Sequence, residues 1–200
     1  DRECSVQRRN QKIIEEAPSP GISDTIRQQL HDGALDLARH VGYVGAGTVE
    51  FMVGDDDSIT FLEVNTRLQV EHPVTEVISG IDLVEWQIRV ASGEALPMSQ
   101  EEVLARHHGH GIEVRINAED PAEGKFLPSP GPISKLHLPN GFGVRFDTGY
   151  DSGDEISQYY DNLVGKLIVW GRDRETCIAR TIRALEEMTV EGVATTIPAD

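Results

Sequence analysis

The stretch of sequence that decides the fold is residues 61–73, FLEVNTRLQVEHP. A β-rich run ends at Asn65, and a guanidinium, an amide, a carboxylate and an imidazole follow within eight positions. No periodic row of apolar residues accounts for these groups, so core packing does not explain them. Arg67 offers a planar fork for a small oxyanion, Gln69 and a backbone N–H can complete the cradle, and Glu71 is placed to act as a base. The stretch therefore predicts an anion site.

The run before this stretch predicts one strand of a hairpin. Residues 47–53 and 59–65 are β-rich and flank the turn residues 55–58, DDDS. If Gly54 pairs with Ile59, the two strands face each other in antiparallel register. A single bulge would shift this register.

In that register Glu50 lies directly opposite Glu63, and Asn65 shares their face. Like charges in such positions repel, and a hard divalent cation would offset the repulsion. The alternative is an exposed acidic hairpin, which the two glutamates alone would favour. The polar residues that follow Asn65 shift the balance to a cation site.

The remaining pattern predicts an α+β fold with prominent antiparallel pairing. Ser23 is a candidate N-cap for a helix that ends before Gly42, and a second helix spans residues 83–91 with Gly93 just beyond it. The other expected elements are extended chain at 4–16, strands at 111–117, 133–138, 142–147 and 163–170, and a helix at 174–188. The turn Pro139-Asn140-Gly141 predicts that the strands at 133–138 and 142–147 form a hairpin.

A change of composition over residues 92–110 predicts a division of the chain. Gly93 ends a helix pattern, Pro97 interrupts, and a polar stretch follows. We place one part at residues 1–98 and the other at 107–200. The three histidines near this division, His107, His108 and His110, are interpreted as solvated linker.

Charge and cysteine content narrow the classes of partner. The 200 residues carry 18 Lys and Arg against 34 Asp and Glu, a net charge of −16, which argues against a nucleic acid partner. No apolar run reaches the ~18 residues of a membrane span. Cys4 and Cys177 are far apart, which predicts a reducing, cytoplasmic location. Any anion must meet a local basic patch, and the first twelve residues supply one in Arg2, Arg8, Arg9 and Lys12. Ordinary solvated surface is the favoured interpretation for Arg8 and Arg9.

Taken in order, these motifs resemble the biotin carboxylase component of biotin-dependent carboxylases, a family with the ATP-grasp fold. The matching segments cover essentially the whole chain and include residues 4–12, 15–18, 45–51, 61–76, 113–121, 127–131 and 159–162. The resemblance implies the C-terminal half of an ATP-grasp domain over residues 1–98. The biotin carboxylase C-terminal domain, largely antiparallel sheet with flanking helices, would follow over 107–200 and be incomplete at its end.

The activity implied by this resemblance is ATP- and bicarbonate-dependent carboxylation of biotin on a carrier protein, through carboxyphosphate. It is the first half-reaction of an acetyl-CoA or other acyl-CoA carboxylase, as used in fatty acid biosynthesis. The implied partners are a biotin carboxyl carrier domain, a carboxyltransferase and a second copy of the chain through the region of Phe142 and Arg145. Neither nucleic acid nor membrane is expected.

Roles follow by matched position, as the resemblance implies them. Glu50 and Glu63 would hold Mg²⁺ or Mn²⁺ with the help of Asn65. Bicarbonate would lie among Lys12, Arg67, Gln69 and the backbone N–H of Val70. Glu71 would remove the bicarbonate proton, and Arg115 would stabilise the biotin enolate. The nucleotide side would be formed by Gln7, Asn10 and Gln11 together with Glu50 and Glu63, although many family members carry His where Asn10 stands.

Two alternatives stay open at this point. One is a different ATP-grasp ligase, such as a carbamoyl phosphate or peptide ligase, against which residues 69–73 argue. The other is a non-catalytic assembly module of the same fold. The family's N-terminal domain and Gly-rich lid have no counterpart in these 200 residues, and neither does a Met-Lys-Met acceptor. We therefore expect the chain to be a piece of something longer and to be inactive alone.

Overall fold

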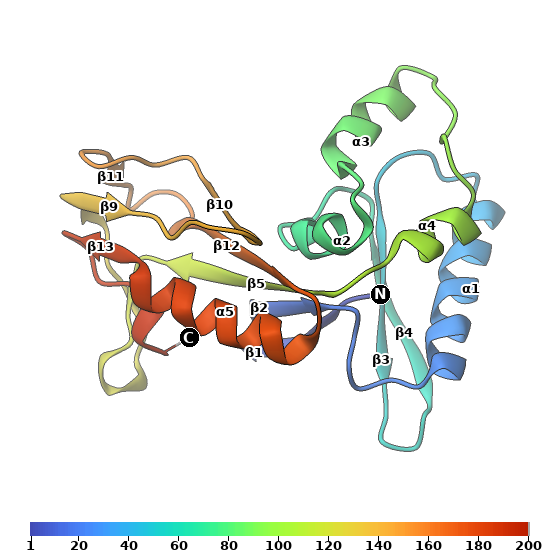
Figure 1. Ribbon diagram of the computed structural model, residues 1–200, viewed down its shortest axis with the longest axis horizontal. Coiled ribbons are helices and arrows are strands. Elements are labelled where there is room, and N and C mark those ends of the chain that lie inside the picture. Colours follow the sequence, from blue (N-terminus) through green and yellow to red (C-terminus); the bar gives the residue numbers. More distant parts are fainter. Residues whose placement is uncertain (200) are drawn as a thin grey trace.

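The structure is a computed structural model that describes residues 1–199. Its largest sheet has five strands in the order β1-β2-β5-β12-β10, and every neighbouring pair is antiparallel (Figure 1). The strands are β1 (Glu3–Arg8), β2 (Gln11–Ala17), β5 (His110–Asn117), β10 (Val144–Thr148) and β12 (Leu163–Gly171). The expected α+β fold with antiparallel sheet is confirmed. Because β2 pairs with β5, this sheet includes strands from both sides of the proposed division, which stays a prediction.

The two faces of this sheet have different chemistry because side chains alternate along each strand. Helix α5 (Arg174–Glu187) packs on one face, and the main hydrophobic core lies beneath it with Val114, Ile116 and Leu167 at its centre. Helix α2 (His72–Ser79) lies on the opposite face (Figure 1). A side chain at Gly111 would collide with Val77 of α2, so the missing side chain lets the helix approach β5 closely. The face under α2 carries charged residues of the sheet, among them Glu113 and Arg115.

The acidic hairpin forms as expected from β3 (Thr48–Val53) and β4 (Ile59–Asn65). Glu50 lies directly opposite Glu63, which confirms the predicted pairing at the site. The expected Gly54–Ile59 pair is wrong, because a bulge between Glu50 and Phe51 brings Val53 opposite Ile59. Helix α1 (Asp24–His40) lies beside this hairpin (Figure 1).

The predicted helix boundaries hold where caps are present. The Ser23 hydroxyl accepts from the Ile26 N–H at 3.3 Å, and helix α3 (Leu83–Ala91) ends before Gly93. Two short helices, α2 and α4 (Gln100–Arg106), were not predicted from the sequence. Both carry signals, since Pro73 stands in the first turn of α2, and Ser99 and Glu102 form a capping box at α4.

The hairpin predicted around residues 139–141 is wrong. Strand β9 (Lys135–His137) pairs with β13 (Thr189–Glu191), and β10 pairs with β12. An Asn-Gly hairpin turn requires positive φ at both residues, and Asn140 does not adopt it. The two strands therefore separate and join different partners. The remaining short strands are β6 (Glu119–Asp120), β7 (Leu127–Pro128), β8 (Gly131–Pro132) and β11 (Glu155–Ile156).

His110 corrects another expectation. It is the first residue of β5 and is buried, not part of a solvated linker. Its Nε2 lies 2.7 Å from Glu16 Oε2, and Arg174 at the start of α5 also donates to that carboxylate at 2.7 Å. The histidine therefore joins β5 to β2 and α5. Across residues 1–199, none of the helices is both long and apolar enough to cross a membrane.

Candidate functional site

All twelve predicted site residues line one open cleft of about 700 Å³, between the acidic hairpin and the charged face of the large sheet. The cleft brings together the residues predicted for the metal, for bicarbonate and biotin chemistry, and for the nucleotide side. These residues are Gln7, Asn10, Gln11, Lys12, Glu50, Glu63, Asn65, Arg67, Gln69, Val70, Glu71 and Arg115, and Arg9 and Leu62 also line the cleft. These residues come from β1, β2 and the turn between them, from β3, β4 and β5, and from the loop before α2. The fold thus brings together positions more than 100 residues apart in sequence.

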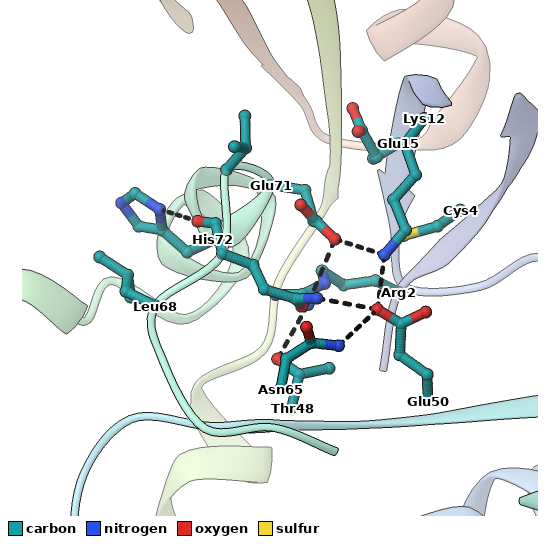
Figure 2. Close-up of polar contacts among 12 residues, drawn as sticks. Arg2, Cys4, Lys12, Glu15, Thr48, Glu50, Asn65, Leu68, Glu71 and His72 are labelled. Carbon is teal, nitrogen blue, oxygen red and sulfur yellow. Dashed lines mark hydrogen bonds and ion pairs between the residues drawn. The ribbon is translucent and has the colours of Figure 1, made fainter. Parts of the chain in front are cut away.

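Lys12 on β2 is the central cation of the cleft. Its Nζ donates to Glu50 Oε1 at 2.7 Å and to Glu71 Oε1 at 2.7 Å, as Figure 2 shows. Burial alone would lower the pKa of Lys12, but the hydrogen bonds to the two carboxylates outweigh burial and raise it. Lys12 is therefore a fixed positive charge between the hairpin and the loop.

Glu71 is the most protected acid of the cleft, with 2% of its surface exposed. Lys12 holds one carboxylate oxygen, and Arg115 donates to the other at 3.0 Å. Burial would raise the pKa of Glu71, yet the Lys12 hydrogen bond and the Arg2 charge lower it below its usual value. Glu71 is thus ionised at neutral pH and can accept a proton.

Gln69 joins the loop to the hairpin. Its Nε2 donates to Glu50 Oε1 at 2.8 Å, and its Oε1 accepts from Arg2 at 2.5 Å. Arg2 also donates to Thr48 Oγ1 at 3.1 Å. Arg2 had been placed only in a basic patch, and the structure gives it a specific position beside the cleft.

The hairpin end of the cleft has the donor set for a hard cation. The Asn65 amide donates to Glu50 at 3.1 Å and to Glu63 at 3.0 Å, so the three side chains converge. Among the described residues Glu63 has no ion-pair partner, and no group of three His, Cys, Asp or Glu side chains forms a complete metal site. Two carboxylates and an amide fit Mg²⁺, which keeps waters and substrate phosphates as its other ligands.

Arg67 and the predicted nucleotide-side residues lie at the exposed rim. The Arg67 guanidinium donates to the Leu68 carbonyl at 3.2 Å and is 3.4 Å from Asn65 Oδ1, which leaves it open to the cleft. Gln7 and Asn10 are exposed, and Gln11 is half-buried. Arg8 departs from the solvated interpretation, because it is half-buried, forms an ion pair with Glu119 and stacks on the Phe126 ring.

Two contacts outside the cleft hold its loop in place. The His72 ring lies with Nδ1 2.7 Å from the Gln69 carbonyl, and Lys166 donates to the Val70 carbonyl at 2.8 Å. Its position next to Glu71 in sequence would suit either a residue that orients Glu71 or a structural hydrogen bond, and the observed contact is with the backbone. Burial lowers the pKa of His72, so its imidazole is neutral at neutral pH.

Glu15 is a site residue that the sequence analysis did not single out. It lies on β2, is 0% exposed, and accepts from Arg115 Nε at 2.7 Å. The sequence does contain an indication of this pair, because a glutamate in a buried strand needs a partner and Arg115 lies in another buried strand. Without the register of β2 on β5 the pair could not be assigned.

Comparisons with known proteins agree with this geometry. Residues 1–99 match the family model of the carbamoyl-phosphate synthase L chain, ATP binding domain, and residues 113–199 match that of the biotin carboxylase C-terminal domain. A biotin carboxylase from a Nostoc species is 50% identical over 98% of this chain, which covers 43% of that protein. An acyl-coenzyme A carboxylase alpha3 subunit from Mycobacterium leprae is 52% identical over 98% of this chain, which covers 32% of it.

Solved structures give the same answer. The biotin carboxylase domain dimer of Hydrogenobacter thermophilus 2-oxoglutarate carboxylase, in complex with MgADP, ADP and bicarbonate, superposes with a TM-score of 0.94. It is 48% identical to this chain, which covers 43% of it, and 98% of this chain is matched. The chain thus spans about a third to two-fifths of the length of these relatives. Two family models that together account for nearly all of the described residues, and relatives near 50% identity along the whole chain, place this chain in the biotin carboxylase family.

Proposed function

We propose that this chain supplies the bicarbonate-binding and proton-accepting part of a biotin carboxylase. The whole enzyme would carboxylate biotin on a carrier domain at the expense of ATP. The observation that carries this proposal is the position of Glu71, held ionised between Lys12 and Arg115 in the cleft that also contains Glu50 and Glu63. A base and two cations within reach of a predicted metal site are the groups that this chemistry requires.

The first step would join bicarbonate to phosphate. Lys12, Arg67, Gln69 and the Val70 N–H would hold bicarbonate, and Glu71 would take its proton. A bicarbonate oxygen would then attack the γ-phosphorus of ATP, the bond from that phosphorus to ADP would break, and carboxyphosphate would form. Mg²⁺ bound by Glu50, Glu63 and Asn65 would neutralise charge on the phosphates. Gln7, Asn10 and Gln11 would lie toward the nucleotide.

The second step would transfer the carboxyl group. Carboxyphosphate breaks down to carbon dioxide and phosphate, and the ureido nitrogen of biotin forms a bond to the carbon of carbon dioxide. The ureido N–H proton leaves as that bond forms, and the released phosphate is the base at hand. Arg115 would stabilise the negative charge on the ureido oxygen, since a fixed cation helps most where charge develops.

The proposal includes three partners. A carrier domain would bring biotin, and a carboxyltransferase would use the carboxylated product. A second copy would pair through Phe142, which is 80% exposed beside Trp170, and Arg145, which bonds Glu76 at 2.8 Å. A relative whose structure is described as a domain dimer supports pairing with a second copy. We also propose a cytoplasmic location, for which the two free cysteines are the support.

Replacing Glu71 tests the function directly. In the full-length protein, Glu71→Gln should lower bicarbonate-dependent ATP hydrolysis and biotin carboxylation by about 100-fold or more, because the amide accepts no proton. The matched control is Glu101→Gln, an exposed carboxylate on α4 outside the cleft, which should leave both rates unchanged. Wild-type rates in Glu71→Gln would show that Glu71 is not the base. A rate of ATP hydrolysis that does not depend on bicarbonate or biotin would instead support another ATP-grasp ligase. Absence of turnover in the wild type would support a non-catalytic assembly module.

A further inference from the structure

A second pair of carboxylates lies beneath the cleft, on the charged face of the large sheet. Glu15 on β2 and Glu113 on β5 are directly opposite each other in the strand register. Both residues are 0% exposed. Directly opposed side chains on antiparallel strands have Cβ atoms about 4.5–5.5 Å apart. Two negative charges so close would repel strongly without water to screen them.

Neither of the cations near this pair donates to Glu113. Arg115 donates to Glu15 Oε1 at 2.7 Å and to Glu71 Oε2 at 3.0 Å. Lys166 donates to the Val70 carbonyl at 2.8 Å, and its Nζ is 3.9 Å from Asp147.

Three oxygens of the pair are left without partners. Within residues 1–199, both carboxyl oxygens of Glu113 and Oε2 of Glu15 are buried and make no hydrogen bond. An ionised Glu113 would therefore be a buried charge with no ion-pair partner, an arrangement that proteins avoid by protonation. Glu15, by contrast, has the Arg115 guanidinium to stabilise its charge.

We propose that Glu15 and Glu113 hold one proton between them in the resting protein, and that neutral Glu113 is a positioning residue for Arg115. With Glu113 neutral, the guanidinium spans two carboxylates, Glu15 and Glu71. An ionised Glu113, two residues from Arg115 on the same face of β5, would compete with Glu71 for that guanidinium. The proton on Glu113 thus keeps Arg115 directed toward the cleft.

The pKa directions agree with this geometry. Burial raises the pKa of Glu113 to about 8, against the pull of Lys166, and the Glu15 charge raises it further. Burial also raises the pKa of Glu15, although Arg115 opposes it. The other charged groups that act on Glu113 are Arg115 on its own strand and Glu71 at the start of α2. On α2 itself, His72 contacts the Gln69 carbonyl and Glu76 contacts Arg145.

The sign of the stability effect follows from linkage. In the unfolded chain the pKa of a glutamate carboxyl group has its ordinary value of 4.5, whereas burial in the folded protein raises the pKa of Glu113 to about 8. The folded state therefore binds this proton more tightly than the unfolded state. Its stability falls as the pH rises from the pKa of the unfolded chain to the pKa of the folded protein. A neutral side chain of the same shape at this position would avoid that loss.

Thermal unfolding of the full-length protein provides the first test. The difference in Tm between Glu113→Gln and wild type should become more positive from about pH 5 to about pH 9. The matched control, Glu175→Gln at an exposed position of α5, should show a difference that does not change with pH. A flat difference for Glu113→Gln would overturn the shared proton.

Infrared spectroscopy tests the proton even if Glu113→Gln does not fold. The wild type should show the C=O stretch of a neutral carboxylic acid at about pH 7, and this band should disappear by about pH 9. Glu15→Gln should move its disappearance to lower pH, because the repelling charge is gone. Absence of the band at about pH 7 would show that both groups are ionised and would end the proposal.

The positioning role has its own readout and rests on the proposed function. In wild type, kcat for biotin carboxylation should fall as pH rises through about 8, and Glu113→Gln should keep its activity over that range. An identical alkaline fall in both proteins would overturn the positioning role. If neither protein carboxylates biotin at any pH, the proposed function fails, while the unfolding and infrared results still decide the shared proton.

Discussion

Lys12 Nζ lies 2.7 Å from Glu50 and 2.7 Å from Glu71, so one ammonium group joins a predicted metal ligand to the predicted base. This contact connects the acidic hairpin to the loop before α2 through the large sheet. It also means that the charge of Lys12 lowers the pKa of both carboxylates, against the effect of burial.

Removing Lys12 should therefore shift the pH dependence of the reaction. Glu71 must be ionised to accept a proton, so activity is lost as pH falls through its pKa, which Lys12 keeps low. In Lys12→Gln that pKa rises, and the acid limb of kcat/KM for bicarbonate should move to higher pH, with KM for bicarbonate raised about tenfold or more. The control is Lys135→Gln, an exposed lysine paired with Glu191. An unchanged acid limb would contradict the assigned pairing.

Glu63 should control metal affinity. In the full-length protein, Glu63→Gln removes one of two carboxylates at the hairpin, and the Mg²⁺ concentration for half-maximal ATP hydrolysis should rise by about 10-fold or more. Asp55→Asn in the exposed hairpin turn is the matched control and should leave the Mg²⁺ dependence unchanged. If the two variants behave alike, general acidity of the hairpin attracts the metal, and no specific site exists.

Arg115 should not tolerate lysine. Its guanidinium contacts Glu15 and Glu71 at once, and a lysine ammonium cannot span both in the same geometry. Arg115→Lys should lower kcat for biotin carboxylation by about 100-fold. Arg106→Lys at the exposed end of α4 serves as control. Comparable rates in the two variants would show that the role of Arg115 is generic positive charge.

The core under α5 should be sensitive to cavities. Leu167 is 0% exposed at the centre of this core, and Leu167→Ala should lower the free energy of unfolding by about 2–5 kcal/mol. Ile182 on α5 is 52% exposed, so Ile182→Ala should lower the free energy of unfolding far less. Denaturant unfolding of both variants checks this ordering, and equal losses would contradict the observed packing.

The 200-residue chain alone should show no bicarbonate-dependent ATP hydrolysis. Its cleft holds the proposed base and the three proposed metal ligands, but the relatives it matches are more than twice as long. Phosphate release measured with MgATP, with and without bicarbonate, tests this. A bicarbonate-dependent signal would show that these residues suffice for the first step.

Much of the site could be predicted because its chemistry is encoded locally. Glu50 opposite Glu63 follows from two β-rich runs and a short turn, and the bulge that shifts the register lies beyond them on the turn side. The hairpin at 139–141 could not be excluded from sequence, because its failure depends on the φ of Asn140 and on which strands compete for pairing. The role proposed for Glu113 could not be predicted either, because it depends on the strand register that places Glu15 opposite this residue.

The two ends of the cleft rest on supports of unequal stiffness. Lys12 and Arg115 belong to neighbouring strands of a five-stranded sheet, where backbone hydrogen bonds fix their spacing. Glu50 and Glu63 belong to a ribbon of two strands that, within residues 1–199, pair only with each other. A tilt of this ribbon breaks the contacts of Glu50 with Lys12 and Gln69 but no ladder of the sheet. The end of the cleft proposed to bind bicarbonate is thus held by the five-stranded sheet, and the end proposed to bind the metal is the part that can tilt.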